Sequence, residues 1–453
     1  MVPFRMPQTP MSALGLPQSL PRVAAQVQRE RNEELRRRKC VVLVVILVCS
    51  LVLLYELAQW TIGGSIAAAQ RKETQRAVDE LRMKRQQGEA HLVKEKAKNA
   101  KRSRSVKGFR DDKQIVMLLT NYRDSRACAQ TLMEAHAMAF LPGRVHFRVF
   151  DEVHLGVEDS CVKVFCDLRP EECRTMLRTK QLRFATRDAS GALGVTVAKH
   201  LVESMVARKE FGEHFYLSVD PTVSFTKNWD LGLLKQWYSI GNDMAILSIV
   251  PKALELKGRA NNPTTIILQC SARIHSKSID AVVEYNPPEP RPKVHSALFA
   301  PVLQSQYTEL FHFGPVSALL KIRSDPHTPQ ISVGHEYARA TRFWTNGYDF
   351  YAPTEDIVYA THDWRPSLAK ESHALEAEVQ RSNRRIRRLL KLPVSSTKAE
   401  PLVEEHKYAL GSRRAMAQWQ SFSKIDPMAP YNESTTNQFV ACDEQLKYVR
   451  HQF

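Results

Sequence analysis

The chain has 453 residues, 43% of them hydrophobic and 25% charged, a globular composition that can bury a core over most of its length. The formal net charge of +17 is concentrated at one end, because residues 1–113 hold 23 Lys and Arg against 11 Asp and Glu, which leaves +5 for the rest. A basic terminus without zinc-finger spacing or an RNA-binding aromatic signature argues against nucleic acid as a partner.

The N-terminal 112 residues contain one apolar segment between two charged ones. Residues 1–39 are expected to form a cytoplasmic tail that ends in four consecutive basic residues, and the uncharged run CVVLVVILVCSLVLLY follows at Cys40. A membrane helix needs about 17–25 apolar residues, so this run is at the short end unless the residues from Leu57 onward prolong it past Glu56. We predict one transmembrane signal anchor at residues 40–60. A cleaved signal peptide is the alternative, but the chain that precedes the run is too long for a usual one.

The charges around this run predict its orientation. The basic cluster lies just before the run, and no Lys or Arg follows until Arg71. The positive-inside rule then places the N-terminus in the cytoplasm and the body in a lumen, a single-pass type II arrangement. Residues 61–112 are expected to form a charged stem, and a short span suits the thin membranes of the early secretory pathway.

Six cysteines fall in the predicted lumenal body, and their even number favours disulfides in an oxidising compartment. They lack the paired C-x-x-C spacing of a zinc site, and their pairing cannot be read from the sequence. One sequon, Asn432-Glu433-Ser434, could accept an N-glycan in a lumen. The six cysteines are Cys128, Cys161, Cys166, Cys173, Cys270 and Cys442.

From residue 114 onward, short β-type runs alternate with helical patterns, which indicates an α/β unit with a largely parallel sheet. Residues 251–300 are less regular and contain a Pro-rich run at 287–292. We therefore divide the body into a first half at 113–250, a second half at 251–430 and a tail at 431–453. Strands are predicted at 114–119, 145–150, 182–185, 213–219 and 244–250, and helices at 127–140, 194–209, 231–238 and 382–390.

Three polar clusters are expected at strand ends, the edge where open α/β sheets bind ligands. The first is Tyr122-Arg123-Asp124, whose ring can stack on a base while its Arg pairs with phosphate. The tripeptide alone also fits an ordinary capping turn.

The second cluster runs from Asp188 through Gly191 to Gly194. Its glycines permit close backbone approach, and the helix expected from Gly194 would offer N–H groups to a diphosphate. The Gly-Lys-Ser/Thr ending of a P-loop is missing, so the pattern predicts a different type of phosphate site.

The third cluster closes the strand predicted at 213–219 with Asp220-Pro221-Thr222. A carboxylate at a strand end can bind a hard divalent cation that bridges the diphosphate of a nucleotide. The same pattern also fits an Asp that caps a helix or a turn, and the sequence leaves both interpretations open.

Longer segments, taken in order, resemble a known family. It is the family of Golgi and cytoplasmic N-acetylglucosaminyltransferases that includes the Skp1 hydroxyproline enzyme and trypanosomatid mucin-type O-glycan initiators. The resemblance covers residues 114–427. The matching segments are 115–124, 188–230, Asp325-Pro326, Gly334-His335-Glu336, 342–345, 347–353, 408–414 and Ile425-Asp426.

The resemblance implies a GT-A fold, in which a Rossmann-like sheet binds a nucleotide sugar, and a Golgi enzyme of type II topology. Its activity would be the transfer of N-acetylglucosamine from UDP-GlcNAc to a Thr, Ser or hydroxyproline hydroxyl of a protein. The donor-binding residues carried over from the family are Tyr122, Arg123, Asp124, Asp188, Gly191 and Lys199, and the family usually has Arg where Lys199 stands.

The family also implies a metal ion and a catalytic pair. Asp220 would begin an Asp-x-His motif for Mn²⁺ or Mg²⁺, in which Thr222 stands at the His position, and His362 would be a further ligand. Glu336 and Asp220 would be the catalytic residues, and Glu336 would position or deprotonate the acceptor.

Two departures from the family pattern open alternatives. Threonine oxygen is a poor substitute for imidazole at Thr222, and the family's Gly-Glu-Glu segment has His335 in its middle. We interpret the chain as an active transferase. Because of these departures, one alternative is a catalytically inactive relative that acts as a partner of a transferase. A transferase that uses another UDP-sugar is the other. We expect His335 to be a surface histidine rather than a metal ligand.

Overall fold

The computed structural model describes residues 51, 53, 112–259, 264–293, 300–360, 373–395, 401–442 and 446–450. The chain divides into two units, 1–95 and 96–453, and every described residue except Leu51 and Leu53 lies in the second. The predicted tail, membrane span and stem thus lie outside the described residues, apart from these two leucines and Asp112. Among the helices that are described, none is both long and apolar enough to cross a bilayer.

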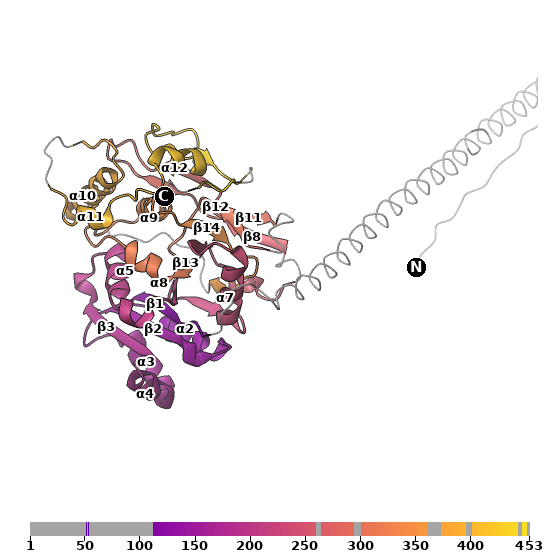
Figure 1. Ribbon diagram of the computed structural model, residues 1–453, viewed down its shortest axis with the longest axis vertical. Helices are drawn as coiled ribbons and strands as arrows, with labels where there is room; N and C mark the ends of the chain where they lie inside the picture. Colours follow the sequence, from indigo (N-terminus) through magenta and orange to yellow (C-terminus); the bar gives the residue numbers. More distant parts are fainter. Residues whose placement is uncertain are drawn as a thin grey trace, which may run out of the picture. The chain divides into compact units, whose positions relative to one another are not determined.

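Within the described part of unit 96–453, eight strands form one mixed sheet (Figure 1). Neighbours among β1 to β4 pair in parallel, as do β6 and β14, whereas β13 runs antiparallel to both β4 and β6. The predicted α/β architecture is confirmed, but the sheet is mixed because β13 and the edge strand β12 reverse direction. In spatial order the strands are β12 (Val302–Gln304), β14 (Asp349–Ala352), β6 (Ala245–Ser248), β13 (Phe311–Pro315), β4 (Phe215–Val219), β1 (Ile115–Tyr122), β2 (Val145–Val153) and β3 (Leu182–Asp188).

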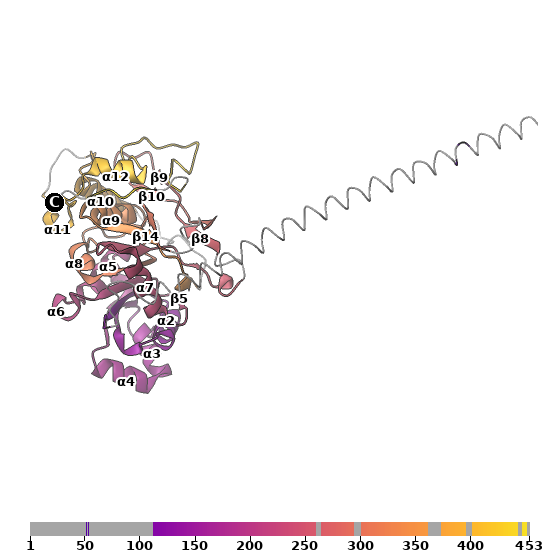
Figure 2. The ribbon, with the colours of Figure 1, turned by 45° about the vertical axis from the view of Figure 1, so that its right-hand side comes forward.

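Helices cover both faces of this sheet (Figures 1 and 2). Successive side chains of a strand point to opposite faces, so Ile115, Met117 and Leu119 pack with α2, α3 and α7, and the residues between them pack with α5 and α8. Because β1 is buried on both faces, it appears in the sequence as a continuous apolar run. The helices are α2 (Ser125–Met138), α3 (Cys161–Leu168), α7 (Trp229–Ile240), α5 (Val195–Ser204) and α8 (Val316–Lys321).

The second half of the chain adds a helical layer around a separate aromatic core. Figures 1 and 2 show α9, α10 and α12 grouped together, away from α2, α3 and α4. Tyr337 and Trp344 of α9 pack with Trp419 of α12, and all three are fully buried. This layer consists of α9 (His335–Thr345), α10 (His373–Leu389), α11 (Glu405–Tyr408) and α12 (Met416–Ser423).

Smaller elements complete the described chain. Three small sheets have the orders β10-β9-β16, β11-β8 and β5-β15-β7. Their strands are β5 (Val223–Phe225), β7 (Lys252–Ala253), β8 (Thr265–Leu268), β9 (Ser271–Ile274), β10 (Val283–Tyr285), β11 (Glu289–Pro292), β15 (Val358–Ala360) and β16 (Phe439–Val440). The short helices are α4 (Pro170–Arg178), α6 (Arg208–Phe211) and the 3₁₀ turns Pro142–Arg144, Ala189–Gly191 and Leu254–Leu256.

One predicted helix differs from the structure, and one segment that was predicted to be irregular contains a strand. The helix expected at 194–209 is broken into α5 and α6, because the buried Val206 turns into the core that these helices share with α8. The Pro-rich run at 287–292 contains the strand β11, which pairs only with β8. A proline lacks the N–H that a central strand needs, and an edge strand tolerates that loss. The other predicted helices and strands are present with shifted ends.

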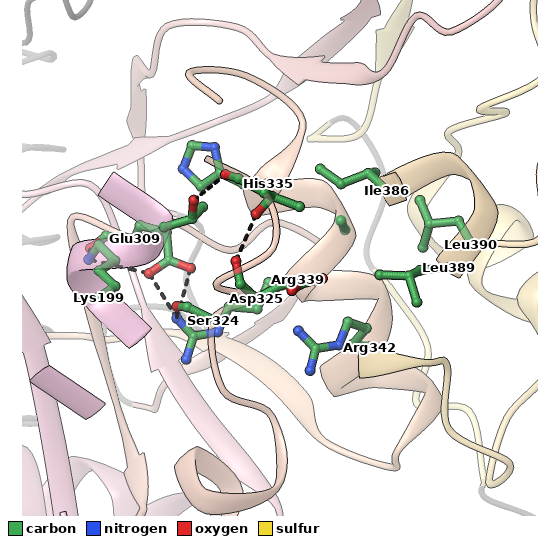
Figure 3. A pocket seen from close by; sticks show the side chains of 13 residues that line it. Lys199, Glu309, Ser324, Asp325, His335, Arg339, Arg342, Ile386, Leu389 and Leu390 are labelled. Atoms are coloured by element: carbon green, nitrogen blue, oxygen red, sulfur yellow. Dashed lines mark hydrogen bonds and ion pairs between the residues drawn. The ribbon is translucent and has the colours of Figure 1, made fainter. Parts of the chain in front are cut away.

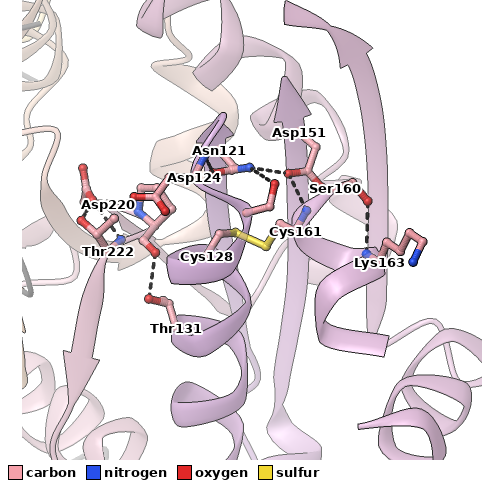
Figure 4. The surroundings of a disulfide bond; sticks show 12 residues. Asn121, Asp124, Cys128, Thr131, Asp151, Ser160, Cys161, Lys163, Asp220 and Thr222 are labelled. Atoms are coloured by element: carbon pink, nitrogen blue, oxygen red, sulfur yellow. Dashed lines mark hydrogen bonds between the residues drawn. A yellow bond between two sulfur atoms is a disulfide. The ribbon is translucent and has the colours of Figure 1, made fainter. Parts of the chain in front are cut away.

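The six body cysteines form three disulfides, as their even number predicted, and the structure supplies the pairing. Cys128–Cys161 joins α2 to α3 (Figure 4), and Cys166–Cys173 joins α3 to α4. Cys270–Cys442 fastens the C-terminal segment beside β9. All three crosslinks lie in the part of the chain that was predicted to be lumenal.

Candidate active site at the carboxyl edge of the sheet

The three polar clusters lie at one edge of the sheet. Since β1, β2, β3 and β4 run parallel, their carboxyl ends meet there, the usual ligand edge of α/β sheets. Tyr122 ends β1, Asp188 ends β3, and Asp220 directly follows β4. Figure 4 shows Asp124 and Asp220 near the ends of these neighbouring strands. The sequence prediction that these residues share an edge is therefore confirmed.

A buried asparagine shapes the turn after β1. The Asn121 Nδ2 donates to Asp151 Oδ1 at 2.9 Å, and its Oδ1 accepts from the Asp124 N–H at 3.2 Å (Figure 4). Arg123 has φ of +57°, which is uncommon for a residue other than glycine. The turn leaves the Tyr122 ring 58% exposed, so this ring is free to stack on a flat ligand.

Arg123 and Asp188 are both engaged by the loop that follows β2. The Arg123 guanidinium contacts Glu158 at 2.7 Å, and the Asp188 Oδ2 accepts from the Leu155 N–H at 3.0 Å. Hydrogen bonds from Ser190 and from Leu155 lower the pKa of Asp188 to about 2, so this carboxylate is ionised at neutral pH. A phosphate bound by Arg123 would have to compete with Glu158.

Gly194 begins α5 in a conformation that glycine favours. Its φ is +91°, and a Cβ atom there would lie 3.1 Å from the backbone of Gln330. The Gln330 N–H donates to the Leu193 carbonyl at 2.8 Å, so a protein segment makes the close approach. Gly191 lies in the turn before it, where an added Cβ would meet nothing within 4 Å. The structure thus gives Gly194 a packing role, and its approach to a diphosphate stays a prediction.

Asp220 forms a turn of its own. Its Oδ1 accepts hydrogen bonds from the Thr222 N–H at 3.0 Å and from the Thr222 hydroxyl. The Asp220 N–H donates to the Leu310 carbonyl at 3.1 Å. No hydrogen bond to Oδ2 of Asp220 occurs among the described residues. One carboxylate oxygen therefore fixes the turn, and the other is available to a ligand.

The ligands expected for a divalent cation are only partly described. Asp220 and Thr222 supply a carboxylate and a hydroxyl, whereas His362 lies outside the described residues. Across the described ranges, no group of three or more His, Cys, Asp or Glu side chains could hold a metal ion. The described donors alone therefore do not fit a divalent-cation site, and a metal set that includes His362 stays a prediction.

The segment 305–310, which leads into β13, connects three of the predicted site residues. The Lys199 Nζ donates to the Glu309 carbonyl at 2.9 Å, and the Glu336 Oε1 accepts from the Glu309 N–H at 2.8 Å. Glu336 also accepts from the Thr308 hydroxyl at 3.0 Å, and Leu310 binds the Asp220 N–H as described above. Lys199, Glu336 and Asp220 are therefore attached to consecutive residues of one segment.

The side chain of Glu309 belongs to a buried set of charges that the sequence analysis did not identify. The Glu309 carboxylate contacts Arg339 at 3.0 Å and Lys199 at 3.3 Å, and Arg339 also contacts Glu203 at 2.8 Å. Burial alone would raise the pKa of Glu309, but Arg339 and Lys199 hold it well below its usual value. The two carboxylates thus neutralise the two cations in a buried environment. Lys199, which was expected to lie along the donor, is paired with Glu309 instead.

A small cavity adjoins these charges (Figure 3). It encloses about 30 Å³, which is room for about two water molecules and far too little for a nucleotide. Lys199 and Glu309 line one side, and Ile386 and Leu389 of α10 line another. His335 also lines it and is half-buried, with an Nδ1 that has no hydrogen-bond partner among the described residues. The expectation that His335 is a surface residue is therefore wrong.

Comparison with known proteins gives a family match. Residues 167–429 match the family model described as Glycosyltransferase (GlcNAc), which is more than half of the chain. No curated protein matches the chain significantly.

Solved structures of glycosyltransferases are similar at low sequence identity. GalNAc-T7 with UDP, GalNAc and Mn²⁺ has 8% identity and a TM-score of 0.41, over 62% of this chain and 48% of that one. S. aureus TarS 1–349 with UDP-GlcNAc has 12% identity and a TM-score of 0.37, over 65% and 69%. The mannosyltransferase PcManGT from Pyrobaculum calidifontis, with GDP-Man and Mn²⁺, has 9% identity and a TM-score of 0.33, over 66% and 81%. The chain spans about half the length of the GalNAc-T7 chain, and these TM-scores carry no argument about activity.

Proposed function

Because the chain belongs to the GlcNAc glycosyltransferase family, we propose that it transfers N-acetylglucosamine from UDP-GlcNAc to a hydroxyl group of a protein. The acceptor would be a Thr, Ser or hydroxyproline side chain. The donor would lie along the carboxyl edge of the sheet, with its uracil near the exposed ring of Tyr122 and its diphosphate towards Asp220.

One arrangement supports this activity. Asp220 and Glu336 each use one carboxylate oxygen to fix local structure, and their other oxygens accept no hydrogen bond within the described residues. Both side chains belong to residues anchored on segment 305–310. Two carboxylates held by a rigid segment, each with a free oxygen, suit a site that must hold a donor and an acceptor in register.

In the proposed reaction, the acceptor oxygen forms a bond to C1 of the sugar, and the bond between C1 and the UDP oxygen breaks. The acceptor proton passes to the free Oε2 of Glu336, and UDP leaves with the bonding electron pair. The Asp220 carboxylate orients the donor from the end of β4. A divalent cation would be held by the predicted ligands Asp220, Thr222 and His362, and it would neutralise charge on the leaving diphosphate.

A UDP-release assay on the full chain tests this activity. We expect UDP release from UDP-GlcNAc with a Thr-rich peptide and Mn²⁺, and loss of at least about 10²-fold in rate in Asp220→Ala, the scale seen when one electrostatic group of an active site is removed. Asp167→Ala is the matched control, because Asp167 is exposed on α3 and pairs with Lys163. A wild-type rate equal to that of Asp220→Ala would contradict the proposal, and removal of Mn²⁺ by a chelator tests the cation.

A catalytically inactive relative is the second candidate, and the contact between Thr222 and Asp220 favours it. The N–H and the hydroxyl of Thr222 both donate hydrogen bonds to Asp220 Oδ1. The family motif has a histidine at the position of Thr222. An inactive partner protein would bind UDP without turnover in the same assay. Release of UDP from UDP-galactose or UDP-N-acetylgalactosamine instead would assign a different donor.

We also propose that residues 40–60 anchor the protein in the Golgi membrane with the body in the lumen. The run of apolar residues after a basic cluster supports this topology. The body should resist a protease added to intact vesicles and be degraded once detergent opens them. Degradation in intact vesicles would contradict the topology, whatever the outcome of the UDP assay.

A further inference from the structure

Asn432 lies in an exposed turn that the proposed reaction does not use. Asn432-Glu433-Ser434 is the one Asn-x-Ser/Thr sequence of the chain with a residue other than proline in the middle. We propose that Asn432 carries an N-linked oligosaccharide, which its Nδ2 receives from a lipid-linked oligosaccharide diphosphate in a lumen.

The geometry of the turn presents the acceptor nitrogen. Asn432, Glu433 and Ser434 are all exposed. The Asn432 Oδ1 accepts from the Ser434 N–H at 3.0 Å and from the Ser434 hydroxyl at 2.7 Å. The carboxamide is thus held by its oxygen, and its Nδ2 donates no hydrogen bond within the described residues. The hydroxyl that a sequon requires at its third position contacts the carboxamide itself.

The turn lies on a fastened surface segment rather than in the core. Downstream, β16 pairs with β9, and Cys442 is bonded to Cys270. The Asn437 Oδ1 accepts from the Ser271 hydroxyl at 3.1 Å, which fixes the segment between the sequon and β16. A glycan at Asn432 would therefore extend into solvent without opening any of these contacts.

The sequence on either side of the turn contains exposed apolar side chains. Met428 is 49% exposed, Tyr431 is 37% exposed and Val440 is 46% exposed. Exposed apolar side chains favour unwanted association when they come together on a surface. A bulky, hydrophilic glycan at Asn432 would add polar surface to this segment of the chain.

The disulfides support a location of the body in the compartment where this modification occurs. Three cystines within the described residues are expected in an oxidising environment, and sequons are modified in that same pathway. The modification requires neither the sugar-transfer site nor a bound metal ion.

A lipid-linked oligosaccharide diphosphate supplies the sugar in this modification. A bond forms between the Asn432 Nδ2 and C1 of the oligosaccharide, and the bond from C1 to the diphosphate oxygen breaks. The lipid diphosphate leaves with the electron pair, and one amide proton passes to solvent. The cell's own oligosaccharyl transferase, rather than this chain, would catalyse the step.

The test is the electrophoretic mobility of the full chain expressed in a eukaryotic cell, before and after digestion with a peptide N-glycosidase. Wild type should lose the mass of one glycan on digestion. The glycosidase should also convert Asn432 to Asp, which mass spectrometry of the peptide that contains residue 432 would detect. Asn432→Gln and Ser434→Ala should both migrate as the digested protein. Ser434→Thr should keep the glycan, because threonine satisfies the sequon.

Asn262→Gln is the matched control, because Asn262-Pro263-Thr264 has proline in the middle and should not be modified. An unshifted wild type overturns the inference, and so does a shift that persists in Asn432→Gln. Since mobility requires no catalysis, this outcome is separate from that of the UDP-release assay.

Discussion

The residues that hold the candidate site together are buried charges, and they act through the segment before β13. Glu309 pairs with Lys199 and Arg339, and its backbone N–H fixes Glu336. Such a set is strongly interdependent, because removal of one member leaves its partners charged and out of water. Glu309 is therefore a positioning residue, which orders the site without any need to touch the substrate.

Glu309→Gln should destabilise the fold by about 3–5 kcal/mol, since it leaves Lys199 and Arg339 with a single buried anion, Glu203. The free energy of unfolding from denaturant titration measures the loss. Glu171→Gln is the matched control, because its pair with Arg174 is 80% and 70% exposed and is worth less than about 1 kcal/mol. Equal losses in the two variants would contradict the role given to Glu309.

Sequence patterns found some of these residues and missed others. Asp220 was identified because an apolar strand delivers it, and Glu336 because of its place in a family segment. Glu309 and Arg339 carry no such local signal, since their burial and pairing join residues 30 apart in the chain. Lys199 was expected to face the donor, and only its contact with Glu309 revealed the pairing in the core.

Whole elements are fixed in place by contacts that act over long stretches of chain. The basic stretch at 382–390 was expected to form a helix, and it lies in α10. Two of its arginines are buried, because Arg385 pairs with Asp325 at 2.7 Å and Arg387 donates to the Ala281 carbonyl at 2.6 Å. The spacing of apolar residues predicted the helix, and tertiary partners turned these two basic residues inward.

A disulfide that closes a longer loop should stabilise the fold more than one that closes a shorter loop. The sequence separations are 7, 33 and 172 residues, which predict about 2, 4 and 5 kcal/mol from chain entropy. Serine pairs at Cys166 and Cys173, at Cys128 and Cys161, and at Cys270 and Cys442 test the order by chemical denaturation. A larger loss for the shortest loop than for the longest would contradict it.

Gly194→Ala should lower the melting temperature, because φ is +91° and the new Cβ would press on the backbone of Gln330 at 3.1 Å. The expected loss is about 1 kcal/mol or more. Gly191→Ala is the control in the neighbouring turn, where a Cβ meets nothing within 4 Å. If calorimetry gives both variants the same melting temperature, the close approach at Gly194 does not constrain the fold.

At the scale of the whole molecule, buried histidines link stability to pH. His312 is fully buried beside Glu309 and the Tyr216 hydroxyl, and burial lowers its pKa to about 4. An unfolded histidine has a pKa of about 6.5, so the unfolded state takes up the proton first as the pH falls. The contribution of His312 to the free energy of unfolding is fully present above pH 6.5 and is lost progressively down to about pH 4. The total loss is up to about 3 kcal/mol.

The free energy of unfolding should therefore fall between pH 6.5 and 4.5, and His312→Gln should flatten that fall by at most about 1.4 kcal/mol per pH unit. Denaturant titrations at several pH values measure both slopes. His146, whose pKa burial also lowers to about 4, contributes a parallel slope that the variant keeps. Identical slopes for wild type and His312→Gln would contradict this account.

The sequence by itself determined the order of most strands and helices, the even set of cysteines and the strand-end positions of Tyr122, Asp188 and Asp220. It could do so because apolar period and turn residues are local properties of the chain. Only the tertiary structure decided the antiparallel place of β13, the disulfide pairing and the burial of Glu309 with Lys199 and Arg339. Those features depend on residues that are distant in sequence, and a buried charge becomes favourable only when its partners are folded around it.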